Sequence, residues 1–452
     1  MTEDRALSQV VAAVRERVTP DEAEREALAR VAADLVSRTE AAAADLPVEA
    51  DVLRVGSTAR DTWLAGDRDI DVFVRFPPDL AREALERYGL AVGHEVLPDG
   101  REEFAEHPYV VGEVEGFDVD LVPCYRLESA TEIRSAVDRT PFHTRYVESA
   151  LTPHLAGEVR VLKAFLSAHG LYGSDLRTEG FSGYLTELLV IEYGGFDGVC
   201  TAAADWHPPV ELDPEGHGEA TFDDPLVVID PTDPERNVAA VLSETNVARF
   251  QHHARALLAD PSVERFEPVE PEPLSEDELR SLLDRRGTTP LAIRFEVPDI
   301  VDDQLYPQLR RTLVGLVERL ERHGFEPLRA EAVADDAALL LVECAVSSLP
   351  TVERHLGPPV HVRTHAEAFF EAYAEDGESF GPFVDGERYV VERPREFTRA
   401  EQLVEETLFD GPLGPDIERA LGSGYDLLVG GEVASLAEEF GADLARYYDP
   451  RP

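Results

Sequence analysis

Alternating apolar and polar residues predict four short strands in the first third of the chain. These segments are rich in valine or aromatic residues and lie at residues 51–57, 69–76, 109–116 and 117–125. Residues 5–45 are predicted to be helical, with a helix start at Thr19, where a capping hydroxyl is followed by Pro20 and two acids. The pattern therefore predicts helices on a small mixed sheet.

Apolar residues recur at helical spacing from about Pro141 to Asp260. Alternating prolines and acids between Arg265 and Ser275 then predict an extended linker. Beyond it, a strand, a helix and two further strands predict a β-α-β-β layer related to ferredoxin-like and RNA-recognition (RRM) folds. The chain is therefore expected to be an α+β multidomain protein. Its predicted domains are residues 1–140, with helices on a mixed sheet, residues 141–264, mainly helical, and residues 275–452, a ferredoxin/RRM-like α+β region.

Acidic residues dominate the composition. The chain carries 91 acidic and 42 basic residues, a formal net charge of -49, while its hydrophobic fraction of 43% is ordinary for a folded protein. Acidity spread over a whole chain resembles the proteins of halophilic archaea that accumulate salt. So negative a protein would normally repel nucleic acid, but molar salt shortens the Debye length to roughly 3 Å and lets a local arginine patch act. The charge therefore does not exclude a nucleic-acid partner.

The cysteines and the apolar segments narrow the class of protein. Cys124, Cys200 and Cys344 are too far apart for a disulfide framework or a CxxC metal site, so they are interpreted as packing residues. No apolar run reaches the roughly eighteen residues of a membrane span, and no signal-peptide pattern starts the chain. A cytoplasmic protein without a membrane partner is expected. The sequence also lacks a Walker A loop, an HExxH motif and a GxSxG motif.

The strongest chemical signal is a pair of acids in a predicted strand. Asp69 and Asp71 lie two residues apart, so both carboxylates leave the same face of the strand while Ile70 and Val72 enter the core. Two carboxylates held in this way can bind magnesium ions, one activating an attacking hydroxyl and one neutralising a leaving pyrophosphate. In so acidic a chain, the same spacing is also typical of a solvated strand face.

Residues on either side of this pair favour the metal site. Gly56 and Ser57 end the preceding strand, where a helix is predicted over residues 58–64, and a glycine, a hydroxyl and helix N–H groups together can bind phosphate oxygens. A third carboxylate is expected on a neighbouring strand. Asp118 and Asp120 both qualify, because they lie on one face of their strand, and alternation does not choose between them.

These motifs together resemble a known family. A GS pair, a spaced D-x-D and a later acid are the signature of the polymerase-beta-like nucleotidyltransferase superfamily. The longer segments GSTARDTWLAGDRDIDVFV, VDLVPCY, LYGSDLRTEGFSGYLTELLV and DPTDPERNVAAVLS resemble archaeal, class I CCA-adding tRNA nucleotidyltransferases. The resemblance extends into the third predicted domain, through GPPVHVRTHAEAFFEAY and GPFVDGERYVVERPRE.

The resemblance implies a fold and a function. The head would be a polymerase-beta-like nucleotidyltransferase domain that uses Mg²⁺. The enzyme would add and repair the 3′-terminal CCA of tRNA from CTP and ATP, without a nucleic-acid template, and would release pyrophosphate by two-metal catalysis. The third domain would bind the acceptor arm and 3′ end of tRNA. The resemblance is also compatible with a homodimer.

Carried over residue by residue, the resemblance makes Asp69, Asp71 and Asp120 the catalytic residues and the magnesium ligands. Where the family often has glutamate first in the pair, this chain has an aspartate, which is one methylene shorter. The resemblance assigns CTP and ATP binding to Ser57, Arg60, His143, Lys163, Tyr172 and Arg236. Of these, Arg236 would help to define the incoming base.

Each of the nucleotide-binding residues has a structural alternative. His143 could cap a helix, Tyr172 could be a packing aromatic, and Arg60 and Arg236 could form surface ion pairs. Lys163 is the single lysine beside 41 arginines. A compact ammonium kept on a helix in such a chain favours a phosphate contact over chance retention.

Two rival functions remain. The same head occurs in poly(A) polymerases, oligoadenylate synthetases and antibiotic nucleotidyltransferases, from which the third-domain segments distinguish this chain. A noncatalytic RNA-binding relative would be marked by loss of Asp69, Asp71 or Asp120, and all three are present. Base selectivity and product length would separate the rivals directly.

Overall fold

The computed structural model describes residues 2–104, 106–218 and 220–452. The chain divides into two compact units, one up to Val269 together with Pro452, the other from Glu270 to Arg451. The division falls within the proline-rich stretch at residues 265–275. None of the described helices has the length and apolarity that crossing a membrane requires.

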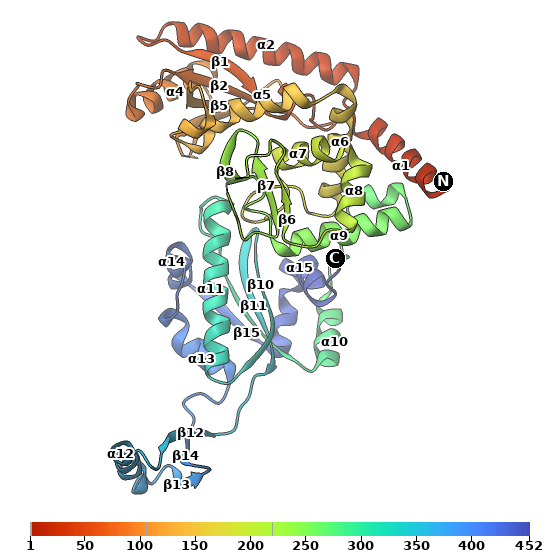
Figure 1. Ribbon diagram of the computed structural model, residues 1–452. Helices are drawn as coiled ribbons and strands as arrows, with labels where there is room; N and C mark the ends of the chain where they lie inside the picture. Colours follow the sequence, from red (N-terminus) through yellow and green to blue (C-terminus); the bar gives the residue numbers. More distant parts are fainter. Residues whose placement is uncertain (1, 105, 219) are drawn as a thin grey trace. The chain divides into compact units, whose positions relative to one another are not determined.

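A five-stranded mixed sheet lies near the start of the first unit. Its strands are β1 (Asp51–Val55), β2 (Asp69–Phe76), β3 (Arg101–Phe104), β4 (Pro108–Val114) and β5 (Phe117–Tyr125), in the order β1-β2-β5-β4-β3. Strands β2 and β5 run parallel and the other pairs antiparallel. Helices α2 (Glu22–Ala44) and α4 (Arg82–Val96) cover one face of this sheet (Figure 1). They bury Ile70, Val72 and Val74 of β2, which point to that face. The alternate residues of β2 therefore point to the opposite face.

Two local predictions at helix ends are wrong. Helix α2 is capped by Asp21, whose carboxylate accepts from the N–H of Glu24, whereas the Thr19 hydroxyl donates back to the Arg15 carbonyl of α1 (Thr2–Val18). The helix expected over residues 58–64 is a single turn, α3 (Gly56–Ala59). It stops there because Asp61 adopts a left-handed conformation, with φ of 57°, that a right-handed helix does not accept.

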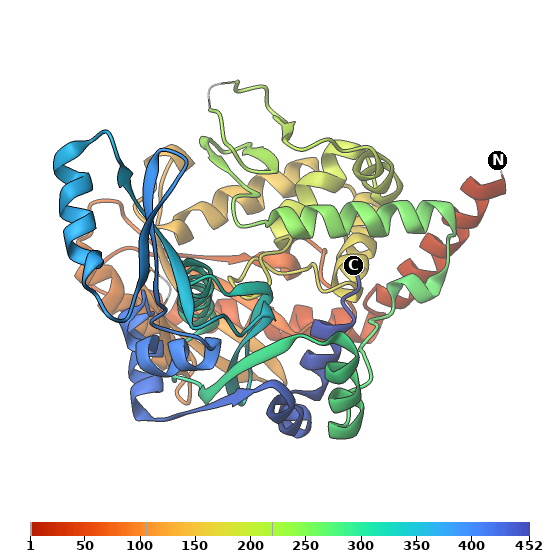
Figure 2. The ribbon, with the colours of Figure 1, turned by 90° about the horizontal axis from the view of Figure 1, so that it is seen from below.

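Helices dominate the rest of the first unit. They are α5 (Thr140–Ala150), α6 (Pro153–Ala168), α7 (Gly183–Tyr193), α8 (Phe196–Ala204) and α9 (Glu244–Ala259), with short turns η1 (Ala130–Glu132), η2 (Ala136–Arg139) and η3 (Val263–Phe266). Helix α1 packs along α6 and α9 (Figure 1, Figure 2). A small sheet of β6 (Val210–Leu212), β7 (Leu226–Asp230) and β8 (Asp233–Asn237) is also present. These strands were not predicted, because the residues of β8, DPERN, show no apolar alternation.

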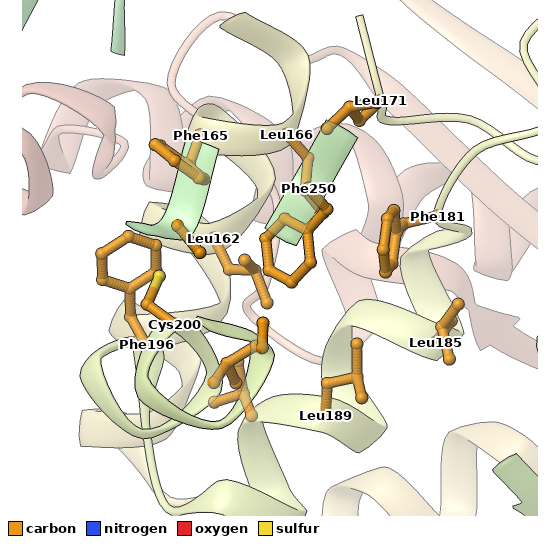
Figure 3. Packing of buried hydrophobic residues seen from close by; sticks show 14 of the residues in the cluster. Leu162, Phe165, Leu166, Leu171, Phe181, Leu185, Leu189, Phe196, Cys200 and Phe250 are labelled. Atoms are coloured by element: carbon orange, nitrogen blue, oxygen red, sulfur yellow. The ribbon is translucent and has the colours of Figure 1, made fainter. Parts of the chain in front are cut away.

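Aromatic rings fill the core of this helical part. Phe250 of α9 is fully buried, and its ring centroid lies 5.0 Å from that of Phe181 and 6.4 Å from that of Phe165 (Figure 3). Removing this ring leaves a cavity among the rings of Phe165, Phe181 and Trp206. Phe250→Ala is therefore expected to lower the free energy of unfolding by about 3–5 kcal/mol. Chemical denaturation at molar KCl measures it, with the exposed Val241→Ala as a control expected to change stability by about 0.5 kcal/mol or less.

Two stacked histidines join the end of α6 to α9. The rings of His169 and His253 lie 3.6 Å apart, and neither Nε2 atom has a partner among the described residues. Burial is the main cause that lowers the pKa of His169 to about 3 and that of His253 to about 4. The unfolded chain, with an ordinary histidine pKa of about 6.5, therefore binds protons first as the pH falls. Stability should be lost progressively from about pH 6.5 down to these folded values.

His253→Gln is expected to reduce this acid sensitivity, because a glutamine amide gains no charge as the pH falls. We expect the variant to lose about 1 kcal/mol less stability than the parent between pH 6.5 and 4.5. Denaturation curves at the two pH values measure the difference. The exposed His154→Gln serves as control, and an equal change in both variants would contradict the assignment.

The second unit contains a four-stranded antiparallel sheet and a smaller three-stranded one. Its elements are α10 (Glu276–Arg286), β9 (Thr289–Glu296), α11 (Asp302–Arg322), β10 (Glu326–Ala334), β11 (Ala337–Val346), β12 (Val352–Pro359), α12 (Arg363–Ala374), β13 (Phe380–Asp385), β14 (Arg388–Pro394), α13 (Ala400–Thr407), η4 (Leu408–Asp410), α14 (Pro415–Ser423), β15 (Tyr425–Val429), η5 (Gly430–Leu436) and α15 (Ala437–Tyr448). The orders are β10-β11-β9-β15 and β12-β14-β13.

Both faces of the four-stranded sheet are covered. Helices α11, α13 and α14 pack on the face that carries Ile293 and Leu340, while α10, η5 and α15 pack on the face that carries Leu339 and Leu341. The first of these helix layers lies along β10 and β11 in Figure 1. Because side chains fill both faces, this sheet does not offer the open aromatic face on which an RNA-recognition domain stacks bases.

Candidate active site

The predicted carboxylates lie on two neighbouring strands of the first sheet. Strands β2 and β5 are parallel, and their register places Asp71 opposite Asp120 and Asp69 opposite Asp118. All four side chains lie on the face away from α2 and α4, since the residues between them belong to the core under those helices. Asp71 and Asp120 are half-buried, whereas Asp69 and Asp118 are exposed.

Electrostatics couple these carboxylates. Burial, followed by repulsion from Asp71, raises the pKa of Asp120 to about 7. Burial, followed by repulsion from Asp69, likewise raises the pKa of Asp71. Among the described residues, none of Asp69, Asp71 and Asp120 has a cationic partner at ion-pair distance. The cluster is therefore a concentration of negative charge that a cation would relieve.

The donor set fits a hard divalent cation, because its ligands are carboxylate oxygens. Within the described part of the chain, no three histidine, cysteine or acidic side chains already converge as metal ligands do. The Asp71 carboxylate lies instead against Gly56. The strands bring the carboxylates together on one face.

Gly56 is required at its position for two reasons. Its φ of 77° lies in the left-handed region, and a Cβ built there would overlap the Asp71 carboxylate. Ser57 follows it on α3, half-buried and without a side-chain partner among the described residues. The turn therefore brings together the Gly56 backbone, the Ser57 hydroxyl and the Asp71 carboxylate, which is a candidate metal ligand.

Gly56→Ala is expected to lower kcat/KM by about 100-fold, because it displaces Asp71 and adds roughly 1–2 kcal/mol of backbone strain. Steady-state nucleotide incorporation measures the loss. Gly66→Ala is the matched control, since Gly66 also has a positive φ of 89° but has open space around it. Equal losses in both variants would show that strain alone matters.

Lys163 and Tyr172 lie together in the helical part. Lys163 is 2% exposed, its Nζ lies 5.7 Å from the centroid of the Tyr172 ring, and none of the described acids lies within ion-pair distance of it. Burial is the main cause that lowers its pKa to about 8, while the charge of Glu187 opposes this. The Tyr172 ring packs against the helical core, and its hydroxyl lies beside Gly183 at the start of α7.

Arg60 connects the head to the helical part. Its Nε donates to Oε1 of Glu187 on α7 at 3.0 Å, and its Nη1 donates to the Thr144 hydroxyl on α5 at 3.1 Å. The Thr62 hydroxyl donates to the same Glu187 oxygen at 2.6 Å. The Arg60 side chain is 8% exposed, so this is a buried ion pair and not the surface pair considered from sequence.

A second cluster forms around Asp230, at the end of β7. His143 of α5 bonds to Oδ2 of Asp230 at 2.8 Å, and Nη1 of Arg236 donates to the same oxygen at 2.9 Å. The His143 ring stacks on Tyr184 with centroids 3.8 Å apart. Burial lowers the pKa of His143, although the charge of Asp230 opposes this shift. Burial alone would raise the pKa of Asp230, but the hydrogen bonds from His143 and Thr232 outweigh it, so the pKa of Asp230 is lowered.

The structure thus places His143 inside a helix, where it does not act as a cap. It groups the predicted residues into the β2–β5 carboxylates, the Arg60–Lys163–Tyr172 group and the His143–Arg236 group. Sequence reasoning missed their buried partners Thr62, Thr144, Glu187 and Asp230 and the half-buried Tyr184. An acid in an otherwise apolar helical stretch, as in YLTELLVIEY, is the signal that could have indicated Glu187.

A small mixed sheet that presents paired acids beside a glycine-serine turn, followed by a helical part with a buried lysine, defines a nucleotidyltransferase. Three family models match the chain: "Nucleotidyltransferase domain" at residues 37–143, "tRNA nucleotidyltransferase, second domain" at residues 157–267, and "CCA-adding enzyme, C-terminal domain" at residues 286–430. Nucleotidyltransferases of this kind typically use divalent metal ions.

Relatives that match almost the whole chain are CCA-adding enzymes too. The chain is 60% identical to the CCA-adding enzyme of Haloarcula marismortui, over 98% of each chain, and 58% identical to that of Halorubrum lacusprofundi, over 99% of each. The CCA-adding enzyme of Methanosarcina barkeri is 40% identical, over 94% of this chain and 95% of its own. The chain belongs to the family of archaeal CCA-adding enzymes. The predicted resemblance is thus confirmed, and the haloarchaeal relatives account for the acidic composition.

A structure described as a cytoplasmic RNA terminal U-transferase aligns with a TM-score of 0.45 and 14% identity, covering 59% of this chain and 99% of its own.

Proposed function

We propose that the chain completes and repairs the 3′ end of tRNA by adding C, C and A from CTP and ATP without a nucleic-acid template. The observation that carries this proposal is the register of β2 and β5, which sets Asp71 opposite Asp120 on one face beside the Gly56-Ser57 turn. In each step the 3′-hydroxyl gives up its proton to water and its oxygen forms a bond to the α-phosphorus. The bond from that phosphorus to the bridging oxygen breaks, and pyrophosphate leaves with the electron pair.

Asp69, Asp71 and Asp120 would hold two Mg²⁺ ions. When bound, the metal ions activate the hydroxyl and neutralise the charge of the leaving pyrophosphate. Asp120 is preferred to Asp118 as the third ligand, because it lies opposite Asp71 and is half-buried, whereas Asp118 is exposed opposite Asp69. The strands fix the spacing of these carboxylates, and the shortened side chain of Asp69 still projects from the same face.

Ser57, Arg60, Lys163 and Tyr172 would bind the triphosphate. Lys163 supplies a compact positive charge beside the Tyr172 hydroxyl. Arg60 retains Nη2, because Glu187 accepts from its Nε and Thr144 from its Nη1. His143 and Arg236 share the buried Asp230, which orients both. Arg236 is half-exposed, so its remaining donors would reach the incoming base.

The remaining assignments concern tRNA and the assembly. Residues 1–140 would form the catalytic head, 141–264 the helical nucleotide-binding domain and 275–452 the domain that binds the acceptor arm and 3′ end. The strand order β10-β11-β9-β15, with α11 between β9 and β10, supports a ferredoxin-like relation. Since both faces of that sheet are covered, tRNA would be bound by shape and backbone contacts. A cytoplasmic location suits these substrates, and the family is compatible with a homodimer, which sedimentation in molar KCl would test.

The test is incorporation of labelled CTP and ATP into tRNA that lacks its last three nucleotides, with Mg²⁺ in high KCl. Addition of C, C and A that then stops, and that chelation abolishes, supports the proposal. An unlimited run of A would indicate a poly(A) polymerase. Binding of tRNA without incorporation would favour a noncatalytic relative.

A further inference from the structure

Asp61 occupies a backbone conformation that is unusual for its residue type. Its φ is 57°, in the left-handed region, and it directly follows Arg60. Aspartate tolerates this region better than most residues, but the conformation still needs support from surrounding contacts. The residue lies where the chain leaves α3 and turns toward β2.

Two arginines from different helices hold Asp61. Nη1 of Arg25, on α2 of the catalytic head, donates to Oδ1 of Asp61 at 2.6 Å. Nη1 of Arg160, on α6 of the helical part, donates to the Asp61 carbonyl and lies 3.6 Å from the same carboxylate oxygen. Asp61 is therefore bonded to both parts of the first unit at once.

Arg160 depends on Asp61 for its pairing. It is 5% exposed, and its Nε has no partner among the described residues. Within the described part of the chain, the Arg160 guanidinium makes polar contacts with Asp61 alone, one with its carbonyl and one with its carboxylate. A buried guanidinium that loses such a partner is left uncompensated, which is costly enough to shift the helix that carries it.

The neighbours of Asp61 belong to the proposed triphosphate site. Arg60 and Thr62 both donate to Oε1 of Glu187 on α7, and the Thr62 N–H donates to the Ser57 carbonyl at 3.0 Å. Lys163 follows Arg160 by three residues on α6, so both lie on one side of that helix. A shift of Arg160 would therefore move Lys163 relative to Ser57 and Arg60.

We propose that Asp61 is a positioning residue that fixes α6 to the turn after α3, so that Lys163, Arg60 and Ser57 face one triphosphate together. The inference rests on the proposed nucleotide-binding roles of those three residues. Asp61 itself does not touch the nucleotide. Its contribution is to the affinity for CTP and ATP and not to the affinity for tRNA.

The test compares Asp61→Asn with a matched control. Asparagine also accepts a positive φ, so this variant removes the charge and keeps the backbone. We expect KM for both CTP and ATP to rise about tenfold, while kcat changes less than about threefold and KM for tRNA less than about twofold. Glu115→Gln is the control, since Glu115 also has a positive φ, of 54°, and pairs with Arg30 of the same helix α2 at 2.8 Å, but is exposed. It should leave every constant unchanged.

Arg160→Gln gives an independent measurement if the first variant does not fold. It should raise KM for the nucleotides at least as much, and the double variant should be no worse than Arg160→Gln alone, because that substitution already removes both contacts between Arg160 and Asp61. Unchanged KM for CTP and ATP in Asp61→Asn would overturn the inference, as would an equal rise in KM for tRNA. Failure of the underlying assignment is distinguishable, because Lys163→Met would then also leave KM for the nucleotides unchanged.

Discussion

Asp120→Asn is expected to lower kcat for nucleotide addition by roughly 10³-fold or more, whereas Asp118→Asn should lower it less than about fivefold. A ligand that holds a catalytic metal supports several kcal/mol of charge stabilisation in the transition state, and about 1.36 kcal/mol corresponds to a factor of ten. The two aspartates lie two residues apart on the same face of β5, so the comparison isolates their positions.

The expectation follows from register and burial. Asp120 lies opposite Asp71 on β2 and is flanked on its other side by Val111 of β4, so its carboxylate is confined among strands. Asp118 lies opposite Asp69 near the start of both strands and is exposed. Asparagine keeps the shape of aspartate but carries no charge, so it binds a divalent cation poorly.

Single-turnover incorporation of ATP into tRNA ending in CC measures the chemical step directly. Both variants should bind tRNA as the parent does, which a filter-binding assay at the same salt concentration checks. If Asp118→Asn is the inactive variant and Asp120→Asn the active one, the ligand assignment is reversed. If both retain activity, the carboxylates of β5 are not metal ligands.

The fold of the head could be predicted where the pattern was local. Strands β2 and β5 have the bounds that alternation indicated, because each carries valines or aromatics on alternate positions. Strand β8 has no such pattern. It forms because its residues pair with β7 and because the Asn237 side chain accepts a hydrogen bond from that strand. The single turn α3 depends on a left-handed Asp61, which the sequence does not reveal.

The candidate site shows the same division between local and distant information. Alternation alone places Asp69 and Asp71 on one face, but it treats Asp118 and Asp120 alike. The pairing of β2 with β5 adds that Asp120 lies opposite Asp71 and Asp118 opposite Asp69. Arg60 and its partner Glu187 are 127 residues apart in sequence. No spacing rule connects such a pair, so the buried partners of the predicted residues emerge only from tertiary packing.

Replacing Lys163 is the second change from which we expect a large effect on nucleotide binding. Lys163→Met is expected to raise KM for CTP and ATP about 100-fold, and Lys163→Arg is expected to restore little of the loss. The ammonium lies in a buried space bounded by the Tyr172 ring, 5.7 Å away, and by Gly183, where even an added Cβ would lie 4.0 Å from Nζ. A planar guanidinium is larger and presents its donors in a rigid fork, so it is not expected to reproduce the contacts of a compact ammonium in this space.

The titration of Lys163 supplies a further readout on the parent enzyme. Because burial lowers its pKa to about 8, the free enzyme loses this positive charge as the pH rises through that value. We expect kcat/KM for nucleotides to fall above about pH 8, since that ratio reports the ionisation of free enzyme. Folding is affected in the opposite sense, because the unfolded lysine keeps its proton up to about pH 10.4 and stability therefore rises between the two values. If activity falls while thermal stability does not, lost nucleotide binding is the cause. If kcat/KM for nucleotides stays constant up to pH 9, Lys163 does not bind the triphosphate through its charge.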